Sequence, residues 1–175
     1  TTGGSQGGAL SVVCASLVPE IKKCAPRSPY LSDFKRVYEM DLHRNIAYEG
    51  LNYYFRSFDP THRRFDEVFK KLGYIDIQNI TKRMKAELMM FTGLMDSVCP
   101  PSTQFAAYNK LTCEKDVVIY PDFGHEHLKG SNDLIYSFIL PEMEFIVEGN
   151  IMDSNGEQLS EATLRLVGDD GTNVK

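Results

Sequence analysis

Three side chains in this sequence are of the types that together carry out nucleophilic catalysis. Ser5 lies in a glycine-rich segment that fits Gly-x-Ser-x-Gly, a pattern that places a serine on a tight turn between a strand and a helix. Asp96 follows shortly after the apolar run 88–92, and His125 follows shortly after the apolar run 116–120. A positioned histidine removes the proton of an attacking serine hydroxyl, and an aspartate orients that histidine. These residues therefore predict nucleophilic attack on an acyl carbonyl.

The segments around these residues predict the elements that bring them together. The apolar runs 88–92 and 116–120 flank a helical pattern, and this alternation is typical of a βαβ unit in a parallel sheet. Consecutive parallel strands end at the same edge of the sheet, where open α/β folds place their sites. We therefore expect an α/β fold with Ser5, Asp96 and His125 at that edge. Their order along the chain is the one that α/β-hydrolases use.

Each of these residues has a distinct role in the predicted reaction. Ser5 Oγ attacks the carbonyl carbon, His125 accepts the serine proton and returns it to the leaving alcohol, and Asp96 orients the imidazole. The backbone N–H of Gln6 supplies one donor to the oxyanion hole. Other interpretations stay open: Ser5 as a helix cap, Asp96 or His125 as structural residues, and the glycines as a phosphate loop. The phosphate loop is disfavoured because no Gly-Lys-Ser/Thr follows.

The pattern elsewhere predicts further helices around the sheet. The small and apolar stretch 7–17 indicates a buried helix, 21–25 indicates a short strand, and Pro26 marks the start of a loop. Helical patterns then fill a predicted insertion at about 32–84. A last helix is expected to begin at a Ser131 cap.

The end of the chain predicts a different kind of structure. Residues 145–175 alternate apolar runs with turn residues, as β-hairpins do. We expect an esterase domain over 1–144 and a β-hairpin tail over 145–175, which is too short to bury a core alone. An α/β-hydrolase commonly needs about 200–250 residues. Because the nucleophile here is residue 5, we expect the C-terminal half of such a domain, with the strand before Ser5 absent.

Composition and charge exclude several classes of function. The 175 residues are 42% hydrophobic and 25% charged with a formal charge of −5, which is typical of a globular protein without a basic face for nucleic acid. No apolar run reaches the roughly 18 residues of a membrane-spanning helix. The N-terminus shows no signal peptide, and a cytoplasmic location is favoured.

The cysteines and histidines do not predict a metal or redox site. Four cysteines without a Cys-x-x-Cys pair are expected to be small residues in or near the core. Zinc binding at His125-Glu126-His127 is disfavoured because no cysteine or third histidine lies nearby in the sequence. Glu126 is expected to be a local hydrogen-bond partner.

Several blocks of the sequence resemble the acetyl xylan esterase and cephalosporin C deacetylase family, which is carbohydrate esterase family seven. The resemblance covers about 1–140. It rests on these segments: Gly3-Gly4-Ser5-Gln6-Gly7-Gly8, Tyr53 to Arg56 with Asp59-Pro60 and His62, Lys71-Leu72-Gly73-Tyr74-Ile75-Asp76, Gly93-Leu94-Met95-Asp96, Cys99-Pro100-Pro101-Ser102-Thr103, and Gly124-His125-Glu126.

The resemblance implies a fold, a reaction and partners. It implies an α/β-hydrolase with a triad of Ser5, Asp96 and His125 that removes acetyl groups from xylo-oligosaccharides and small acetyl esters such as cephalosporin C. It implies a homohexamer and no metal or organic cofactor. The family's Arg-Gly-Gln block and the tyrosine that completes the oxyanion hole have no counterpart in this chain. Within the tail, 149–164 resembles the first strands of a carboxypeptidase-regulatory-like β-sandwich.

Two other functions remain open on the sequence alone. A serine peptidase of the prolyl-oligopeptidase type shares the Gly-x-Ser-x-Gly-Gly turn and the order of the triad. Alternatively, the chain is a catalytically incomplete fragment that acts only in binding or assembly.

Overall fold

A computed structural model describes residues 1–140, 152 and 154–157. The chain divides into two units, Thr1–Glu142 and Met143–Lys175. The predicted hairpin tail over 145–175 lies almost entirely outside the described residues, so the domain boundary at 144 stays a prediction. The sheet and every predicted site residue belong to the first unit.

The first unit is built on a parallel sheet, which confirms the predicted α/β class. In the part of the chain that the structure describes, the sheet has four strands in the order β1-β2-β3-β4. All neighbouring strands run parallel. Their bounds are β1 Thr2–Gly4, β2 Lys23–Arg27, β3 Glu87–Gly93 and β4 Lys115–Tyr120. Because the strands are parallel, the residues that follow β1, β3 and β4 all emerge at one edge.

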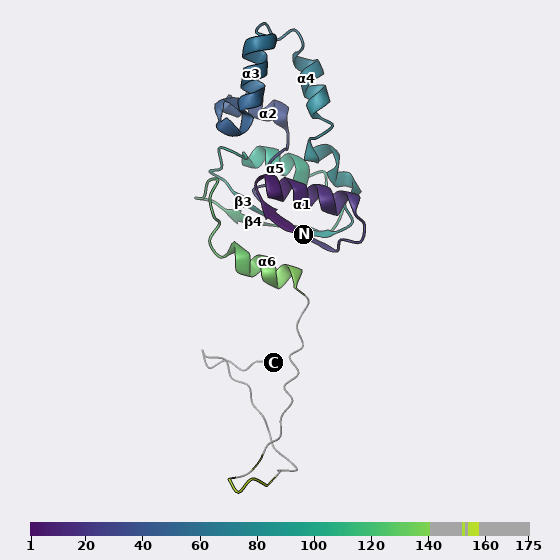
Figure 1. Cartoon of the computed structure of the whole chain (residues 1–175), viewed down its shortest axis with the longest axis vertical. Coiled ribbons are helices and arrows are strands. Elements are labelled where there is room, and N and C mark those ends of the chain that lie inside the picture. Colours follow the sequence, from purple (N-terminus) through teal and green to yellow (C-terminus); the bar gives the residue numbers. More distant parts are fainter. Residues whose placement is uncertain (141–151, 153, 158–175) are drawn as a thin grey trace. The chain divides into compact units, whose positions relative to one another are not determined.

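Helices cover both faces of this sheet (Figure 1). Helices α1 (Gln6–Leu17) and α5 (Pro101–Tyr108) share one hydrophobic core with Leu88 and Met90 of β3. Helix α6 (Ser131–Ile139) packs on the other face, against Ala25 of β2 and Phe91 of β3. The alternation of Leu88, Met90 and Phe91 between the two cores follows from the period of two in a strand.

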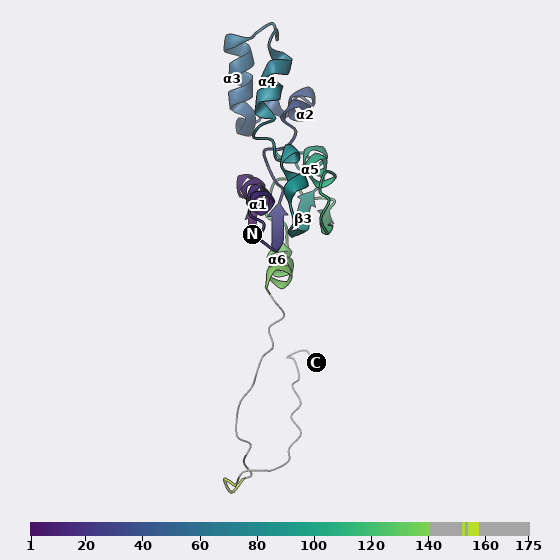
Figure 2. The same cartoon turned by 90° about the vertical axis from the view of Figure 1, so that its right-hand side faces the viewer.

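A helical insertion separates β2 from β3, as predicted for about 32–84. It has its own aromatic core, in which Phe55 and Phe69 are buried. Figure 2 shows α2, α3 and α4 grouped together beyond α1 and α5. The insertion consists of α2 (Phe34–Glu39), α3 (Glu49–Phe58), α4 (Phe65–Leu72) and the short 3₁₀ helices η1 (Leu42–Arg44), η2 (Ile46–Tyr48), η3 (Ile77–Asn79) and η4 (Thr81–Arg83).

Three predictions about strands and helix ends were wrong. The strand before Ser5 is present, because Thr2–Gly4 forms β1 and pairs with β2. Pro26 lies inside β2 rather than in a loop, and Gly3 of the short β1 is its partner in the register. Gly130, with a φ of 76°, caps α6 in place of Ser131. A left-handed cap suits glycine, which has no Cβ to clash.

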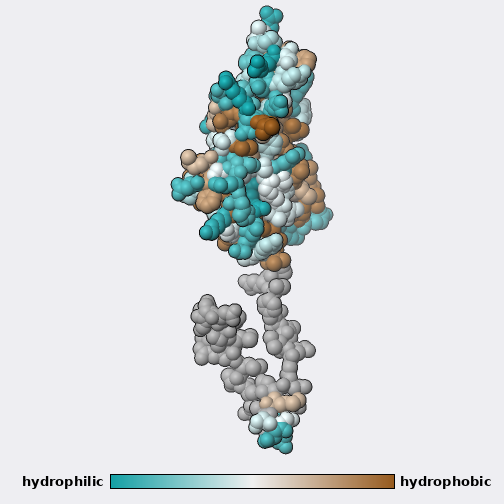
Figure 3. Space-filling view, turned by 60° about the vertical axis from the view of Figure 1, so that its left-hand side comes forward, coloured by the Kyte–Doolittle hydropathy of each residue, from teal (hydrophilic) through white to brown (hydrophobic). Residues whose placement is uncertain are grey.

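The face of the first unit that Figure 3 shows carries both polar and apolar side chains. Leu10 and Leu17 of α1 are about half exposed. Tyr53 and Phe58 of α3 are more exposed than these leucines. No helix among the described residues has the length and apolar character needed to cross a membrane.

Candidate active site

Ser5 occupies a sharp turn between β1 and α1. Its φ of 53° lies in the left-handed region, which is strained for a residue with a side chain. Backbone hydrogen bonds hold it there: the Ser5 N–H donates to the Arg27 carbonyl at 2.9 Å, and the Tyr30 N–H donates to the Ser5 carbonyl at 3.1 Å. Although Ser5 is at the N-cap position of α1, its side chain makes no capping hydrogen bond. The hydroxyl is therefore free to turn away from the helix, and the cap interpretation is wrong.

One glycine of the Gly-x-Ser-x-Gly pattern is required by close packing. A Cβ atom on Gly3 would lie 2.4 Å from the Gly7 carbonyl oxygen, whereas a Cβ atom on Gly4 or Gly7 would meet nothing within 4 Å outside the local chain. The turn thus brings the backbone of α1 against the end of β1. The absent side chain of Gly3 is what allows the serine to sit between them.

Asp96 is held rigidly in the loop after β3. Its Oδ1 atom accepts hydrogen bonds from the backbone N–H groups of Val98 at 2.9 Å and Cys99 at 2.7 Å. The residue is only 3% exposed. The loop also joins the loop that carries His125, because the Met95 N–H donates to the Phe123 carbonyl at 2.9 Å.

His125 links the other two residues, so the structure brings all three predicted side chains together. Its Nδ1 atom lies 2.9 Å from Asp96 Oδ2, and its Nε2 atom lies 3.1 Å from Ser5 Oγ. An ionised carboxylate only accepts hydrogen bonds, so Nδ1 carries the ring proton and Nε2 accepts the serine hydroxyl. This is the tautomer in which a histidine can take the serine proton. Beside it, Glu126 accepts from the Gly124 N–H at 3.2 Å, as expected for a local partner.

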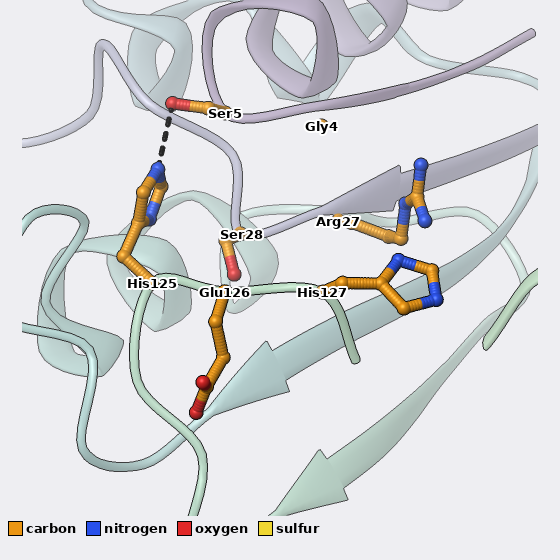
Figure 4. A pocket seen from close by; sticks show the side chains of 7 residues that line it. All are labelled: Gly4, Ser5, Arg27, Ser28, His125, Glu126 and His127. Atoms are coloured by element: carbon orange, nitrogen blue, oxygen red, sulfur yellow. Dashed lines mark hydrogen bonds between the residues drawn. The ribbon is translucent and has the colours of Figure 1, made fainter. Parts of the chain in front are cut away.

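A cavity of about 320 Å³ lies beside the serine and the histidine. Its lining residues are Gly4, Ser5, Arg27, Ser28, His125, Glu126 and His127. Figure 4 shows Ser5 and His125 joined at one end of this group, with Arg27 and His127 next to each other away from them. Six of the seven lining residues carry polar or charged side chains. The Ser28 hydroxyl among them is buried without a partner among the described residues.

Gln6 is the first residue of α1, directly after Ser5. The first N–H groups of a helix have no acceptor within the helix. They also carry the positive end of the helix dipole. The predicted oxyanion donor is therefore placed at a helix N-terminus next to the candidate nucleophile.

Sequence reasoning missed Cys99 as part of this site. The thiol is 1% exposed, and burial together with the nearby charge of Asp96 raises its pKa to about 12, although a hydrogen bond with Ser5 opposes this shift. It lies next to Ser5 and Asp96 only because the loop after β3 folds back. The block Cys99-Pro100-Pro101 contributes to the family resemblance, but nothing in the sequence indicates that Cys99 contacts the serine.

The sheet, its covering helices and the three side chains joined at its carboxyl edge define an α/β-hydrolase. The model of the family described as acetyl xylan esterase (AXE1) matches residues 1–141. This chain therefore belongs to the acetyl xylan esterase family.

Individual relatives agree with this family. The chain is similar to acetyl xylan esterase 1 from Thermoanaerobacterium sp. JW/SL YS485, with 53% identity, a TM-score of 0.77, and 79% of this chain and 43% of that one covered. It is similar to the acetyl xylan esterase from Paenibacillus sp. R4, with 41% identity, a TM-score of 0.74, and 78% and 43% covered. Acetyl esterase Axe7A of Xylanibacter ruminicola is 34% identical over 119 residues, which are 68% of this chain and 25% of the relative. The chain thus spans less than half the length of each.

More distant structures share the fold alone. The acylaminoacyl peptidase of Pyrococcus horikoshii has 16% identity and a TM-score of 0.57, with 84% of this chain and 24% of that one covered. Such a likeness does not transfer an activity.

Proposed function

We propose that Ser5, His125 and Asp96 are the catalytic triad of a carbohydrate esterase that removes acetyl groups. The observation that carries this proposal is the continuous chain of hydrogen bonds from Ser5 Oγ through the imidazole to the buried carboxylate. Membership of the acetyl xylan esterase family supports acetyl esters as the substrate class. Short acetylated xylo-oligosaccharides are the proposed substrates, and small acetyl esters of the cephalosporin C type are a second group.

The geometry supports a two-step reaction through an acetyl-enzyme. The serine oxygen attacks the acetyl carbon while Nε2 of His125 takes the hydroxyl proton, and the sugar oxygen then leaves with that proton. A water molecule then attacks the acetyl-enzyme, again with His125 as the base, and acetate is released. Asp96 stabilises the imidazolium that forms in each step. Side chains and backbone groups of the protein supply this chemistry, so no cofactor is part of the proposal.

The backbone N–H of Gln6 is the proposed oxyanion donor. Negative charge develops on the acetyl oxygen next to Ser5, at the N-terminus of α1, where the helix dipole favours an anion. Removing one such donor from a comparable hydrolase lowers the rate about 100- to 1,000-fold. The family resemblance implies a second oxyanion donor and a hexameric assembly. Both are proposed for the whole protein.

The cavity beside Ser5 supports a small, hydroxylated substrate. Arg27, Ser28, Glu126 and His127 offer hydrogen-bonding groups along its wall. A long acyl chain would need apolar side chains along the wall, and none of the seven lining residues carries one. We therefore propose selectivity for an acetyl group on a sugar.

The proposal is tested by labelling and by comparing substrates. The full chain is treated with a fluorophosphonate probe, and the labelled peptide is identified by mass spectrometry. We expect Ser5 to be labelled, Ser5→Ala to lose the label, and the control Ser137→Ala on α6 to keep it. Hydrolysis of an aryl acetate is then compared with that of a peptide anilide.

Each outcome selects one function. Faster cleavage of the aryl acetate supports the esterase, and faster cleavage of the anilide supports a peptidase instead. A folded chain in which Ser5 resists the probe and neither substrate is cleaved contradicts both and leaves a binding or assembly role.

A further inference from the structure

Three metal-ligating side chains meet behind the candidate nucleophile. One carboxylate oxygen of Asp96, the Sγ atom of Cys99 and one ring nitrogen of His125 all lie within 4.8 Å of one another. The aspartate and the cysteine are buried, whereas the His125 side chain is 26% exposed and forms the side open to solvent. Zinc binding at His125 was disfavoured because no cysteine lies near it in the sequence. The fold brings Cys99 close to His125 and so provides that ligand.

The spacing of these atoms is close to what zinc requires. Zinc binds sulfur at about 2.3 Å and nitrogen or oxygen at about 2.0 Å in a tetrahedron, which puts the ligand atoms about 3.3–3.8 Å apart. Movements of about an ångström bring atoms that lie within 4.8 Å into that range. Three protein ligands and a water molecule complete such a site.

The charges of the cluster select one class of ion. A divalent cation with the Asp96 carboxylate and a Cys99 thiolate is neutral in sum, and a neutral complex avoids the cost of a net charge in a buried place. Thiolate and imidazole ligands favour Zn²⁺ and other soft ions, whereas Mg²⁺ and Ca²⁺ prefer oxygen ligands alone.

We propose that Asp96, Cys99 and His125 form an inhibitory site for a thiophilic divalent cation such as Zn²⁺. The ion takes the place of the proton between Nδ1 of His125 and Asp96, because Nδ1 faces the carboxylate while Nε2 faces Ser5. That proton moves to Nε2, the Cys99 thiol releases its proton to solvent, and no electron is transferred. With Nε2 protonated, the ring cannot accept the proton of the serine hydroxyl. The metal-bound form therefore lacks an activated nucleophile.

The binding itself is tested without any enzyme assay. The full chain is titrated with CoCl₂, because cobalt bound by a thiolate gives a sulfur-to-metal charge-transfer absorption, and ZnCl₂ is then added as competitor. We expect the absorption to appear, to be removed by Zn²⁺, to be lost in Cys99→Ser and to persist in the control Cys113→Ser. His125→Gln, a change at a partly exposed ring, is expected to weaken cobalt binding about ten-fold or more.

The outcomes that overturn the site are equally direct. Absence of the absorption in the parent chain overturns it, as does an absorption that survives unchanged in a folded Cys99→Ser variant. If Cys99→Ser does not fold, the His125→Gln titration decides.

The inhibitory effect rests on the proposed function and is measured separately. Zn²⁺ is expected to slow fluorophosphonate labelling of Ser5, and Cys99→Ser is expected to need about ten-fold more Zn²⁺ for the same effect. Equal sensitivity of both proteins overturns the inhibitory site. If Ser5 is not labelled even without metal, the proposed esterase fails, while the cobalt titration still reports on the site.

Discussion

The hydroxyl of Tyr48 donates a hydrogen bond to the backbone carbonyl of Val98, 2.9 Å away, and so joins the helical insertion to the loop after β3. Tyr48 is only 4% exposed, and its ring packs against Tyr30 at a centroid distance of 5.1 Å. The backbone N–H of Tyr30 in turn donates to the carbonyl of Ser5. Two neighbouring tyrosines thus connect the turn that carries the serine with the loop that carries Asp96.

Replacing Tyr48 by phenylalanine removes this hydrogen bond while keeping the ring. We expect the free energy of unfolding to fall by about 0.5–1.5 kcal/mol, the net contribution of a typical hydrogen bond. Urea denaturation measures the change. Tyr53→Phe is the control, because Tyr53 is 61% exposed and its change should stay within about 0.5 kcal/mol. Equal losses in the two variants would show that the Val98 contact contributes nothing.

Asp96→Asn tests the orientation of His125. The asparagine oxygen can still accept the two backbone N–H groups that bind Oδ1, so the loop should keep its shape. The amide nitrogen cannot accept from Nδ1–H, so the ring changes tautomer and presents Nε2–H to Ser5. We expect aryl acetate hydrolysis to fall by about 10⁴-fold, as in other triad hydrolases, with an unchanged circular dichroism spectrum. A loss of less than about ten-fold would contradict the role given to Asp96.

Gly3→Ala and Gly4→Ala form a matched pair at the turn. A Cβ atom at Gly3 would lie 2.4 Å from a backbone oxygen that cannot move without shifting α1, whereas Gly4 faces open space. We expect Gly3→Ala to lower the free energy of unfolding by about 1–3 kcal/mol and to slow labelling of Ser5. Gly4→Ala should differ little from the parent chain in thermal unfolding. A larger loss of stability in Gly4→Ala than in Gly3→Ala would contradict the close packing of β1 against α1.

Alkylation should distinguish Cys14 from Cys99 in the native protein by their rates of reaction. Burial raises the pKa of Cys99 from its ordinary value of 9.0 to about 12. In the metal-free protein the thiol therefore stays protonated at mildly alkaline pH, while the exposed Cys14 reacts freely. Iodoacetamide at mildly alkaline pH should modify Cys14 first and Cys99 only after unfolding, as read by peptide mass spectrometry. Modification of both at one rate in the folded protein would contradict this assignment.

The parts of the site that local sequence could predict are those carried by short segments. Ser5 was predictable from five consecutive residues, and Asp96 and His125 from their places just after strongly apolar runs. The parallel sheet then fixed where these segments meet, because parallel strands end at one edge. The chain of hydrogen bonds among the three residues agrees with that expectation.

Contacts between distant segments were not predictable in the same way. Cys99 and Tyr48 reach the site through the folding of a loop and of the insertion, and no spacing in the sequence indicates either contact. Pro26 predicts a loop because proline is a common turn signal, yet β2 includes it within a short parallel ladder. Cys14 was expected in or near the core but is exposed on α1, since a helix with small residues all around gives no clear buried face.

The long insertion between β2 and β3 also has a consequence for how the protein folds. These neighbouring strands pair although their residues lie far apart in the sequence, as the pairing of Lys23 with Glu87 shows. The serine and the histidine that meet are 120 positions apart. Contacts between such remote segments form only after the entropy of closing a large loop has been overcome, which slows folding. We therefore expect Ser5, the candidate nucleophile, to gain reactivity during refolding only after the four described strands have paired. The rate at which a fluorophosphonate probe begins to label Ser5 would then report when the native strand order is complete.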